Sequence, residues 1–405
     1  MSPTADTPRS GATVADPAQQ DVFMGEHGPH VMSLREVRRG LTLIVVALAA
    51  AVALYAWMPF EPAPKKGLAL LLFIGILWLT EAIHITITAL MVPVGALLLG
   101  LPKITTASAF ASFADPVIFL FFGGFALATA LHAQRLDRKI AFWLMSLAGS
   151  HLGFASLLLF GVTAGLSMWI SNTATAAMML PLALGIMSHL DRKTERNTFV
   201  FILLGIAYSA SIGGLGTLVG SPPNAIAARA INMDFAGWMK VGFPLMLVLM
   251  PLMVLTLWLV FRPKLNRRIH IPMESIPWTP RRVLAMTLFL LTALAWILGS
   301  EISEWLGIGA PDTLIAVIAA LLVVVLGLAS WEQVSDNTDW GVLFLFGGGL
   351  TLSSLLRSSG ASEVLGDQVA RFLTGAHELW IILGVTTFII ILTALLNLFY
   401  GQGEP

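Results

Sequence analysis

An apolar stretch with a polar interruption constrains this chain more than any other feature. No charged side chain occurs from Gly153 to Ser188, yet the segment SMWISNTATAAMMLPLAL places hydroxyl and amide groups in the middle of this run, at Ser167, Ser171, Asn172, Thr173 and Thr175. Inside a bilayer such groups must find partners other than bulk water. The sequence therefore predicts a re-entrant hairpin over residues 153–190, with the polar turn at its tip.

The composition places the whole chain in a membrane. Hydrophobic residues make up 57% and charged residues 11% of the 405 residues, against about 45–50% and about 25% in soluble domains. We therefore expect an all-α integral membrane protein. The formal net charge of zero argues against nucleic acid as a partner, and the absence of cysteine excludes disulfides and thiol chemistry. No GxSxG motif or carboxylate pair lies within the apolar runs, so we do not expect an enzyme.

The apolar runs predict about nine membrane crossings, because each approaches the roughly 20 residues that a spanning helix needs. They fall at 41–59, 67–82, 85–101, 116–132, 197–230, 241–261, 283–300, 311–328 and 341–356. Residues 153–190 and 378–399 fit poorly as single crossings, and both are interpreted as re-entrant. Residues 1–33 lack apolar periodicity, which predicts a disordered cytoplasmic tail.

Basic residues in the loops predict the orientation. Clusters of Lys and Arg precede the first run, follow the fourth, follow the hairpin, and fill a loop at 263–282. Cytoplasmic loops carry an excess of basic residues, so we expect a cytoplasmic N-terminus in the plasma or inner membrane. All four clusters share one side only if the hairpin returns to its own side. Charge placement therefore supports re-entry independently of the polar motif.

Two segments of the chain form an internal repeat. DPVIFLFFGGFALATAL from Asp115 and DWGVLFLFGGGLTLSSLL from Asp339 both run from an acidic residue through an apolar stretch and paired glycines to a polar exit and a short amphipathic helix. In the predicted topology the two copies point in opposite directions. Inverted repeats are typical of secondary transporters, whose substrate lies midway between discontinuous helices. We therefore expect a first repeat within 34–262 and a second, incomplete repeat within 283–405.

A second polar interruption, SIGGLGTLVGSPPN, breaks the apolar run at 197–230. Together with the SNT turn it offers hydroxyls, amides and free carbonyls, which suit a hard cation such as sodium, while helix N-termini suit an anion. The two motifs therefore predict one shared site, in which each ligand raises the affinity of the other. The competing interpretations are helix–helix hydrogen bonding by the hydroxyls, close packing at Gly216 and Gly220, and proton relay by Glu81, His84 or Asp115.

These motifs, with WLTEAIHITITALMVPV and FLFFGGFALATAL, resemble the divalent anion:sodium symporter family, which carries dicarboxylates, citrate or sulfate. The resemblance extends over most of the chain from about Leu68. It implies a homodimer, an elevator-like transport domain, sodium as the coupling ion and no other cofactor. The site residues that it implies are Ser167, Ser171, Asn172 and the carbonyl of Gly220 for a first sodium ion, and Asn172, Thr173 and Ser221 for the substrate carboxylate.

The C-terminal segment departs from the family pattern. A second SNT is expected at the tip of a second hairpin, but the chain reads TTFIIILTALLNLFYGQGEP. Thr393 falls where the threonine of a second sodium site is expected, and Asn397 occupies the position of the missing serine. The sequence therefore predicts an incomplete second sodium site, as a frameshifted or truncated gene would produce.

The function expected from these observations is sodium-coupled symport of small divalent anions, with C4-dicarboxylates first, by alternating access. Expected partners are the anion, sodium, membrane lipid and a second copy of the chain. The alternatives are a non-transporting remnant or a dimerising partner of an intact carrier, a sulfate carrier, and a sodium-independent anion exchanger.

Overall fold

The computed structural model describes residues 34–102, 104–188, 190–269, 274–307, 309, 311–373, 379–387 and 389–390. Within these residues the chain is helical, with one isolated β-bridge between His151 and Arg268. The all-α class predicted from the sequence is confirmed. The tail at 1–33 lies outside the described residues.

The helices follow in chain order as α1 (Leu34–Trp57), α2 (Pro62–Thr80), α3 (Ile85–Leu98), α4 (Thr106–Phe110), η2 (Ala111–Ala114), α5 (Pro116–Ala133), α6 (Leu136–Met145), η3 (Ser146–Ala148), α7 (Leu152–Ser167), α8 (Asn172–Ile186), α9 (Arg196–Gly213), η4 (Gly214–Gly216), α10 (Pro222–Ala230), α11 (Phe235–Phe261), α12 (Pro280–Ile297), α13 (Gly299–Leu306), α14 (Pro311–Val325), α15 (Trp331–Asn337), α16 (Trp340–Ser358) and α17 (Ala361–Leu373), where η marks a short 3₁₀ helix. Residues 379–387 and 389–390 are also helical.

Seven helical stretches in the described part of the chain are long and apolar enough to cross a membrane. They are α1, α2, Thr106–Ala133, Arg196–Gly216, α11, α12 and α16. The runs predicted at 85–101 and 311–328 form shorter apolar helices, α3 and α14, because glycines with positive φ, Gly100 and Gly327, follow shortly after their last turns. These helices together define a multi-pass integral membrane protein.

The two copies of the repeat begin with the same local structure. Asp115 caps α5 by accepting a hydrogen bond from the backbone N–H of Val117 at 3.0 Å, and Asp339 caps α16 through the N–H of Val342 at 3.0 Å. The short helix before each, α4 or α15, begins with a capping box in which two side chains satisfy each other's backbone N–H groups. The sequence repeat is therefore also a repeat of helix caps.

The repeats pack against each other crosswise. Helix α14 of the second copy lies along α5 of the first, and α3 of the first lies along α16 of the second. A Cβ on Gly123 would overlap the backbone of Ala316, and a Cβ on Gly348 would lie 2.8 Å from the Cα atom of Ala89. Both glycines therefore let two helices approach closely.

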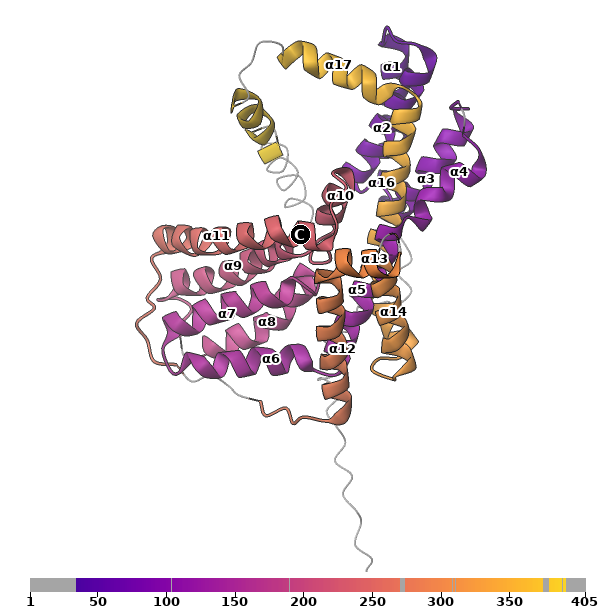
Figure 1. Cartoon of the computed structure of the whole chain (residues 1–405). Helices are drawn as coiled ribbons and strands as arrows, with labels where there is room; N and C mark the ends of the chain where they lie inside the picture. The colour runs from indigo at the N-terminus through magenta and orange to yellow at the C-terminus, as the bar shows by residue number, and fades with distance from the viewer. Residues whose placement is uncertain are drawn as a thin grey trace, which may run out of the picture.

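Helices α6, α7, α8, α9 and α11 form a second group with its own buried core. Figure 1 shows them lying side by side as a stack next to α5 and α12. The segment after α11 holds together the start of α7 and the start of α9. Leu152 N donates to Arg267 O at 2.9 Å, and the Arg267 guanidinium pairs with Glu195 at 2.8 Å. The opposite end of α7 is left to carry the polar turn.

Candidate functional site

The polar turn predicted from the sequence separates two helices. Helix α7 ends at Ser167 and α8 begins at Asn172, so residues 168–171 form the connection. Ser171 is the N-cap of α8, and its Oγ accepts a hydrogen bond from Ala174 N at 3.3 Å. Serine favours this position because its side chain satisfies a free N–H of the first turn. The SNT motif therefore starts a new helix within the apolar stretch.

The second interruption also breaks a helix. Helix α9 ends at Gly213, the short 3₁₀ helix η4 follows to Gly216, and α10 begins at Pro222 after the non-helical residues 217–221. The side chain of Asn224 is 3% exposed, and its Nδ2 donates to the carbonyls of Gly214 and Thr217, both at 2.7 Å. These bonds satisfy backbone oxygens that the break leaves without helical partners. The loop is therefore held in a defined conformation.

The two interruptions meet. The buried hydroxyl of Thr217 donates to the carbonyl of Met168 in the turn and accepts a hydrogen bond from Gly220 N at 3.1 Å. A Cβ on Gly220 would lie 3.0 Å from the same Met168 carbonyl. The turn between α7 and α8 and the loop between α9 and α10 thus form one structure, as the shared-site prediction required.

Four neutral oxygens lie close to one another at this junction. Ser167 Oγ lies 2.7 Å from both Asn172 Oδ1 and Ala210 O. A Cβ built on Gly214 would lie 2.5 Å from Asn172 Oδ1 and 3.0 Å from Gly220 O. A hydroxyl has one proton and can donate to only one of two acceptors. Converging oxygens with too few protons are the environment in which a cation is stabilised.

The chemistry of this cluster favours a monovalent hard cation. Its oxygens come from a hydroxyl, an amide and backbone carbonyls, which carry no formal charge. No group of three or more His, Cys, Asp or Glu side chains that could hold a metal occurs among the described residues. Calcium and magnesium sites normally include carboxylates, whereas carbonyls of broken helices coordinate sodium in membrane transporters. The residues present therefore fit sodium.

The predicted sodium ligands are divided between two environments. Ser167 and Gly220 are buried and Asn172 is half-buried; Asn172 Oδ1 is hydrogen-bonded to Ser167 Oγ and, with Gly220 O, borders the Cβ position of Gly214. Ser171 is exposed and its hydroxyl caps α8. Thr393 lies outside the described residues. The roles of all five residues stay predictions.

The predicted substrate residues lie at two helix starts. Asn172 and Thr173 open the first turn of α8, where Thr173 is exposed, and Ser221 is the half-buried N-cap residue of α10. The side chain of Ser221 makes no capping hydrogen bond. Helix α10 begins with two prolines, which have no N–H. Helix α8 therefore offers backbone N–H groups to an anion, and α10 offers a free hydroxyl.

Three contributors to the site were not predicted individually. The Ala210 carbonyl belongs to the last turn of α9, where it accepts hydrogen bonds from the N–H of Gly214 and from the Ser167 hydroxyl, and the predicted break was the available signal. Thr217 and Asn224 lie within the quoted loop motif, but no side-chain role was assigned to them. Both could have been found in the sequence as short polar side chains in an uncharged loop. Such side chains must form hydrogen bonds when they are buried.

The three residues considered for proton relay, Glu81, His84 and Asp115, lie at the ends of helices. His84 Nδ1 accepts a hydrogen bond from Thr86 N at 3.3 Å at the start of α3, and Glu81 follows α2 with a φ of 44°. Asp115 caps α5 and pairs with Arg229 at 3.3 Å. These contacts favour the structural interpretation of all three residues.

Broken helices that meet in a polar, uncharged site, on an inverted-repeat membrane fold, define a secondary transporter. The family model of citrate transporters matches residues 75–401, and the chain belongs to this family. This agrees with the divalent anion:sodium symporter resemblance. Both the family and the relatives described next are transporters, so the expectation that the chain is not an enzyme is confirmed.

Three relatives illustrate this membership. An uncharacterized transporter of Haemophilus influenzae is 51% identical over 378 residues, covering 91% of this chain and 80% of the relative. An uncharacterized transporter of Methanocaldococcus jannaschii is 37% identical over 82% of this chain and 75% of its own length. The sodium-dependent dicarboxylate transporter SdcS of Staphylococcus aureus is 31% identical over 80% of this chain and 68% of its own length.

Proposed function

We propose that this protein couples sodium to the uptake of a small divalent anion, with C4-dicarboxylates as the substrate class. The observation that carries the proposal is the set of oxygens around Asn172 Oδ1, which contacts Ser167 Oγ and borders Gly214 together with Gly220 O, while Ser167 Oγ also contacts Ala210 O. The name of the Staphylococcus aureus relative, a sodium-dependent dicarboxylate transporter, supports sodium as the coupling ion and a dicarboxylate as the substrate in this proposal. The cell membrane, with a cytoplasmic N-terminus, is the proposed location, supported by the basic loops.

Asn172 provides the physical link between the two ligands in this proposal. Its Oδ1 faces Ser167 and the missing Cβ position of Gly214, so its Nδ2 is directed elsewhere and remains a donor for an anion. A sodium ion bound to Oδ1 fixes the amide in this orientation. Without the ion, rotation of the amide allows Nδ2 to donate to Ser167 Oγ instead. Sodium binding therefore prepares the donor that the anion needs, which gives positive coupling.

The proposed movement is elevator-like and takes place within a homodimer. Helices α6–α9 and α11 share one core, while α5, α12 and α14 contribute to another. In our proposal the first group moves as the transport domain against the second, which carries the dimer contacts. The repeat boundaries, 34–262 and 283–405, and the re-entrant path of residues 153–190 are part of the same proposal.

The direct test is uptake by the purified chain in liposomes. We expect accumulation of labelled succinate when sodium is outside and little when choline replaces it, with labelled sulfate as the competing substrate. Asn172→Ala should abolish sodium-dependent uptake. Asn337→Ala is the control, because that exposed amide bonds only to the Gln333 carbonyl at the end of α15. Undiminished uptake in choline would indicate an exchanger, and no uptake by the unaltered chain would favour the non-transporting alternative.

A matched serine pair tests the oxygen cluster itself. Ser167 and Ser156 are both buried in α7, but Ser156 Oγ donates only to the Leu152 carbonyl of its own helix at 2.8 Å. Loss of a polar contact to a charged partner costs about 1.5–3 kcal/mol. We therefore expect Ser167→Ala to raise the half-saturating sodium concentration about tenfold or more, and Ser156→Ala to leave it unchanged. Equal effects of the two changes would contradict the assigned cluster.

A further inference from the structure

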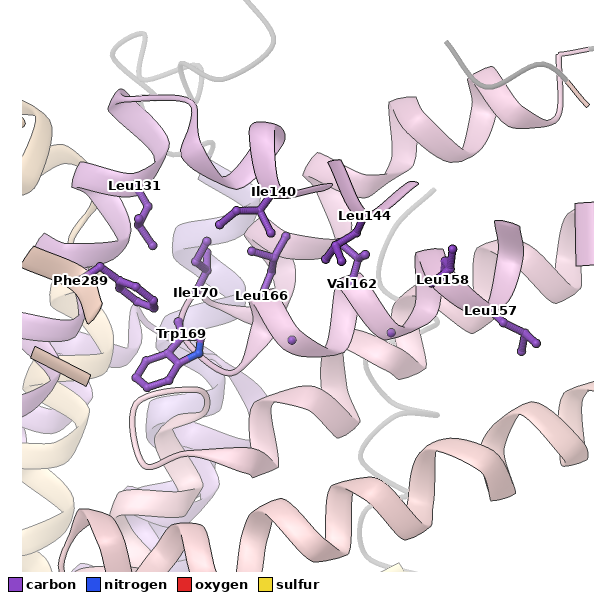
Figure 2. Close-up of a pocket in the computed structure, with 12 residues that line it drawn as sticks. Leu131, Ile140, Leu144, Leu157, Leu158, Val162, Leu166, Trp169, Ile170 and Phe289 are labelled. Atoms are coloured by element: carbon purple, nitrogen blue, oxygen red, sulfur yellow. The ribbon is translucent and has the colours of Figure 1, made fainter. Parts of the chain in front are cut away.

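One side of α7 borders a cavity in the part of the chain that the structure describes. An apolar crevice of about 430 Å³ separates it from α5, α6 and α12 (Figure 2). Leu131 of α5, Ile140 and Leu144 of α6, and Phe289 of α12 face Leu166 of α7 across this crevice, and Trp169 of the polar turn lies at one end. The crevice thus lies between the hairpin and the helices beside it.

Among the described residues that line the crevice there is no charged side chain and no hydroxyl or amide side chain. Two glycines of α7, Gly161 and Gly165, form part of the wall, and a Cβ on either would meet no heavy atom within 4 Å. These glycines therefore leave open space, in contrast to the glycines at the helix crossings. An occupant of such a space must be apolar, since it would find no hydrogen-bonding side chain except the indole of Trp169.

The crevice continues onto the bilayer-facing surface. A second apolar cavity shares Leu157 and Gly161 with it and reaches Met250, Val254 and Trp258 of α11. Only 11% of the apolar window of α11 is buried, the lowest share among the candidate spans. A spanning helix exposed to this extent faces lipid. Leu157, which lines both cavities, is itself 49% exposed, so the crevice is open to the surface at this residue and lipid hydrocarbon can enter there.

The dimensions select one kind of occupant. A helix with its side chains is about 10–12 Å across with a pitch of about 5.4 Å, so a volume of about 430 Å³ holds only about one helical turn. A cavity of this size that is lined mainly by Leu, Ile and Val side chains instead suits a flexible hydrocarbon chain. We propose that the crevice binds an acyl chain of a membrane lipid, inserted laterally from the bilayer between α7 and the neighbouring α5, α6 and α12.

The position of Trp169 connects this lipid site to the polar turn. Its ring packs edge-on against Phe289 with centroids 5.1 Å apart and stacks on Trp296 at 6.3 Å. In the sequence it stands two residues after Ser167 and two before Ser171. An acyl chain in the crevice contacts the indole directly and stabilises this placement of the turn. The inference concerns lipid contact alone and does not depend on sodium coupling.

Fluorescence quenching tests the proposal. Bromine atoms on lipid acyl chains quench indoles that they contact, so the chain is placed in liposomes of ordinary or acyl-brominated phosphatidylcholine. The contribution of Trp169 is the difference between the unaltered chain and Trp169→Phe. We expect brominated lipid to quench this contribution strongly. Gly161→Leu and Gly165→Leu fill the crevice without moving the backbone, and each should reduce the quenching at least twofold.

The control for filling is Gly75→Leu in α2, because a Cβ there also meets nothing within 4 Å and Gly75 does not line the crevice. It should leave the quenching of Trp169 unchanged. Two results would overturn the proposal: a Trp169 contribution that is equal in the two lipids, or quenching that persists in both filled variants.

A cross-linking experiment excludes the competing occupant. The chain contains no cysteine, so any disulfide within the chain can form only between the two engineered cysteines. The helix at 379–387 is apolar and exposed, and it could cover α7 in place of lipid. We expect Gly161→Cys combined with Val385→Cys to form no disulfide under mild oxidation in liposomes. Quantitative formation would show that this helix covers α7 and would overturn the lipid assignment.

Discussion

Glycines serve opposite purposes at the helix crossings and at the polar junction. At the crossings, Gly123 and Gly348 bring backbones together, and the atoms that fill the missing Cβ position belong to continuous apolar helices. At the junction, the missing Cβ position of Gly214 is bordered by two polar atoms, Asn172 Oδ1 at the start of α8 and Gly220 O in the loop before α10. The surroundings of a glycine, more than the glycine itself, therefore distinguish packing from binding.

The largest effect should follow when the missing Cβ position of Gly214 at the junction is filled. Gly214→Ala places a methyl group 2.5 Å from Asn172 Oδ1, and overpacking of this kind costs about 1–3 kcal/mol. Because the cost falls on the arrangement that binds the ion, we expect the half-saturating sodium concentration for uptake to rise about 10- to 100-fold. Gly75→Ala is the control, since its methyl group meets open space. Unchanged sodium dependence in Gly214→Ala would contradict the conclusion that the glycine at the junction differs in role from the glycines at the helix crossings.

Substitutions of glycines at the helix crossings should instead change the thermal stability of the protein. Gly348 and Gly349 are neighbours in α16, but a Cβ would lie 2.8 Å from Ala89 at the first position and meet nothing at the second. Alanine favours helix by about 1 kcal/mol, which only partly offsets an overpacking cost of about 1–3 kcal/mol. We expect Gly348→Ala to lower the thermal unfolding midpoint and Gly349→Ala to preserve or raise it. Neither should change sodium affinity of the folded protein, and a selective loss of affinity in Gly348→Ala would break the comparison.

A smaller effect should follow when the hydroxyl that joins turn and loop is removed. Thr217→Val leaves the Met168 carbonyl and the Gly220 N–H without their shared partner, at a cost of about 1 kcal/mol per bond. We expect sodium affinity in the uptake assay to fall about five- to tenfold. Thr163→Val is the matched control, because that buried hydroxyl bonds only to Leu159 O of its own helix. Equal losses in the two variants would mean that Thr217 does not position the site.

The position of the site could be predicted because polar groups are costly in apolar surroundings. Ser167 and Asn172 stand out in a charge-free stretch, and the prolines and glycines between Ser211 and Asn224 mark a second break. Each motif is locally encoded, so each appeared where it was expected. That the two breaks meet was inferred from the transporter pattern, and the contact of Thr217 with the Met168 carbonyl agrees with that inference.

Other parts of the structure were not accessible in this way. Any residue type supplies a backbone carbonyl, so the sequence could not identify Ala210 as the one that faces Ser167. The crosswise pairing of α3 with α16 depends on tertiary packing. The short helices α4 and α15 were missed although their capping boxes, beginning at Thr105 and Ser330, are visible in the sequence. Apolar periodicity, on which the helix assignments relied, is too brief there to be detected.

The bond from Thr217 to Met168 also dictates an order of events during biosynthesis. The turn at 168–171 is synthesised before the loop that stabilises it, and the Met168 carbonyl acquires its partner only when Thr217 has left the ribosome. Until then a nascent chain presents unsatisfied polar groups to lipid, which is unfavourable. The turn between α7 and α8 is therefore fully satisfied only after the chain has been synthesised beyond α9, as far as Thr217.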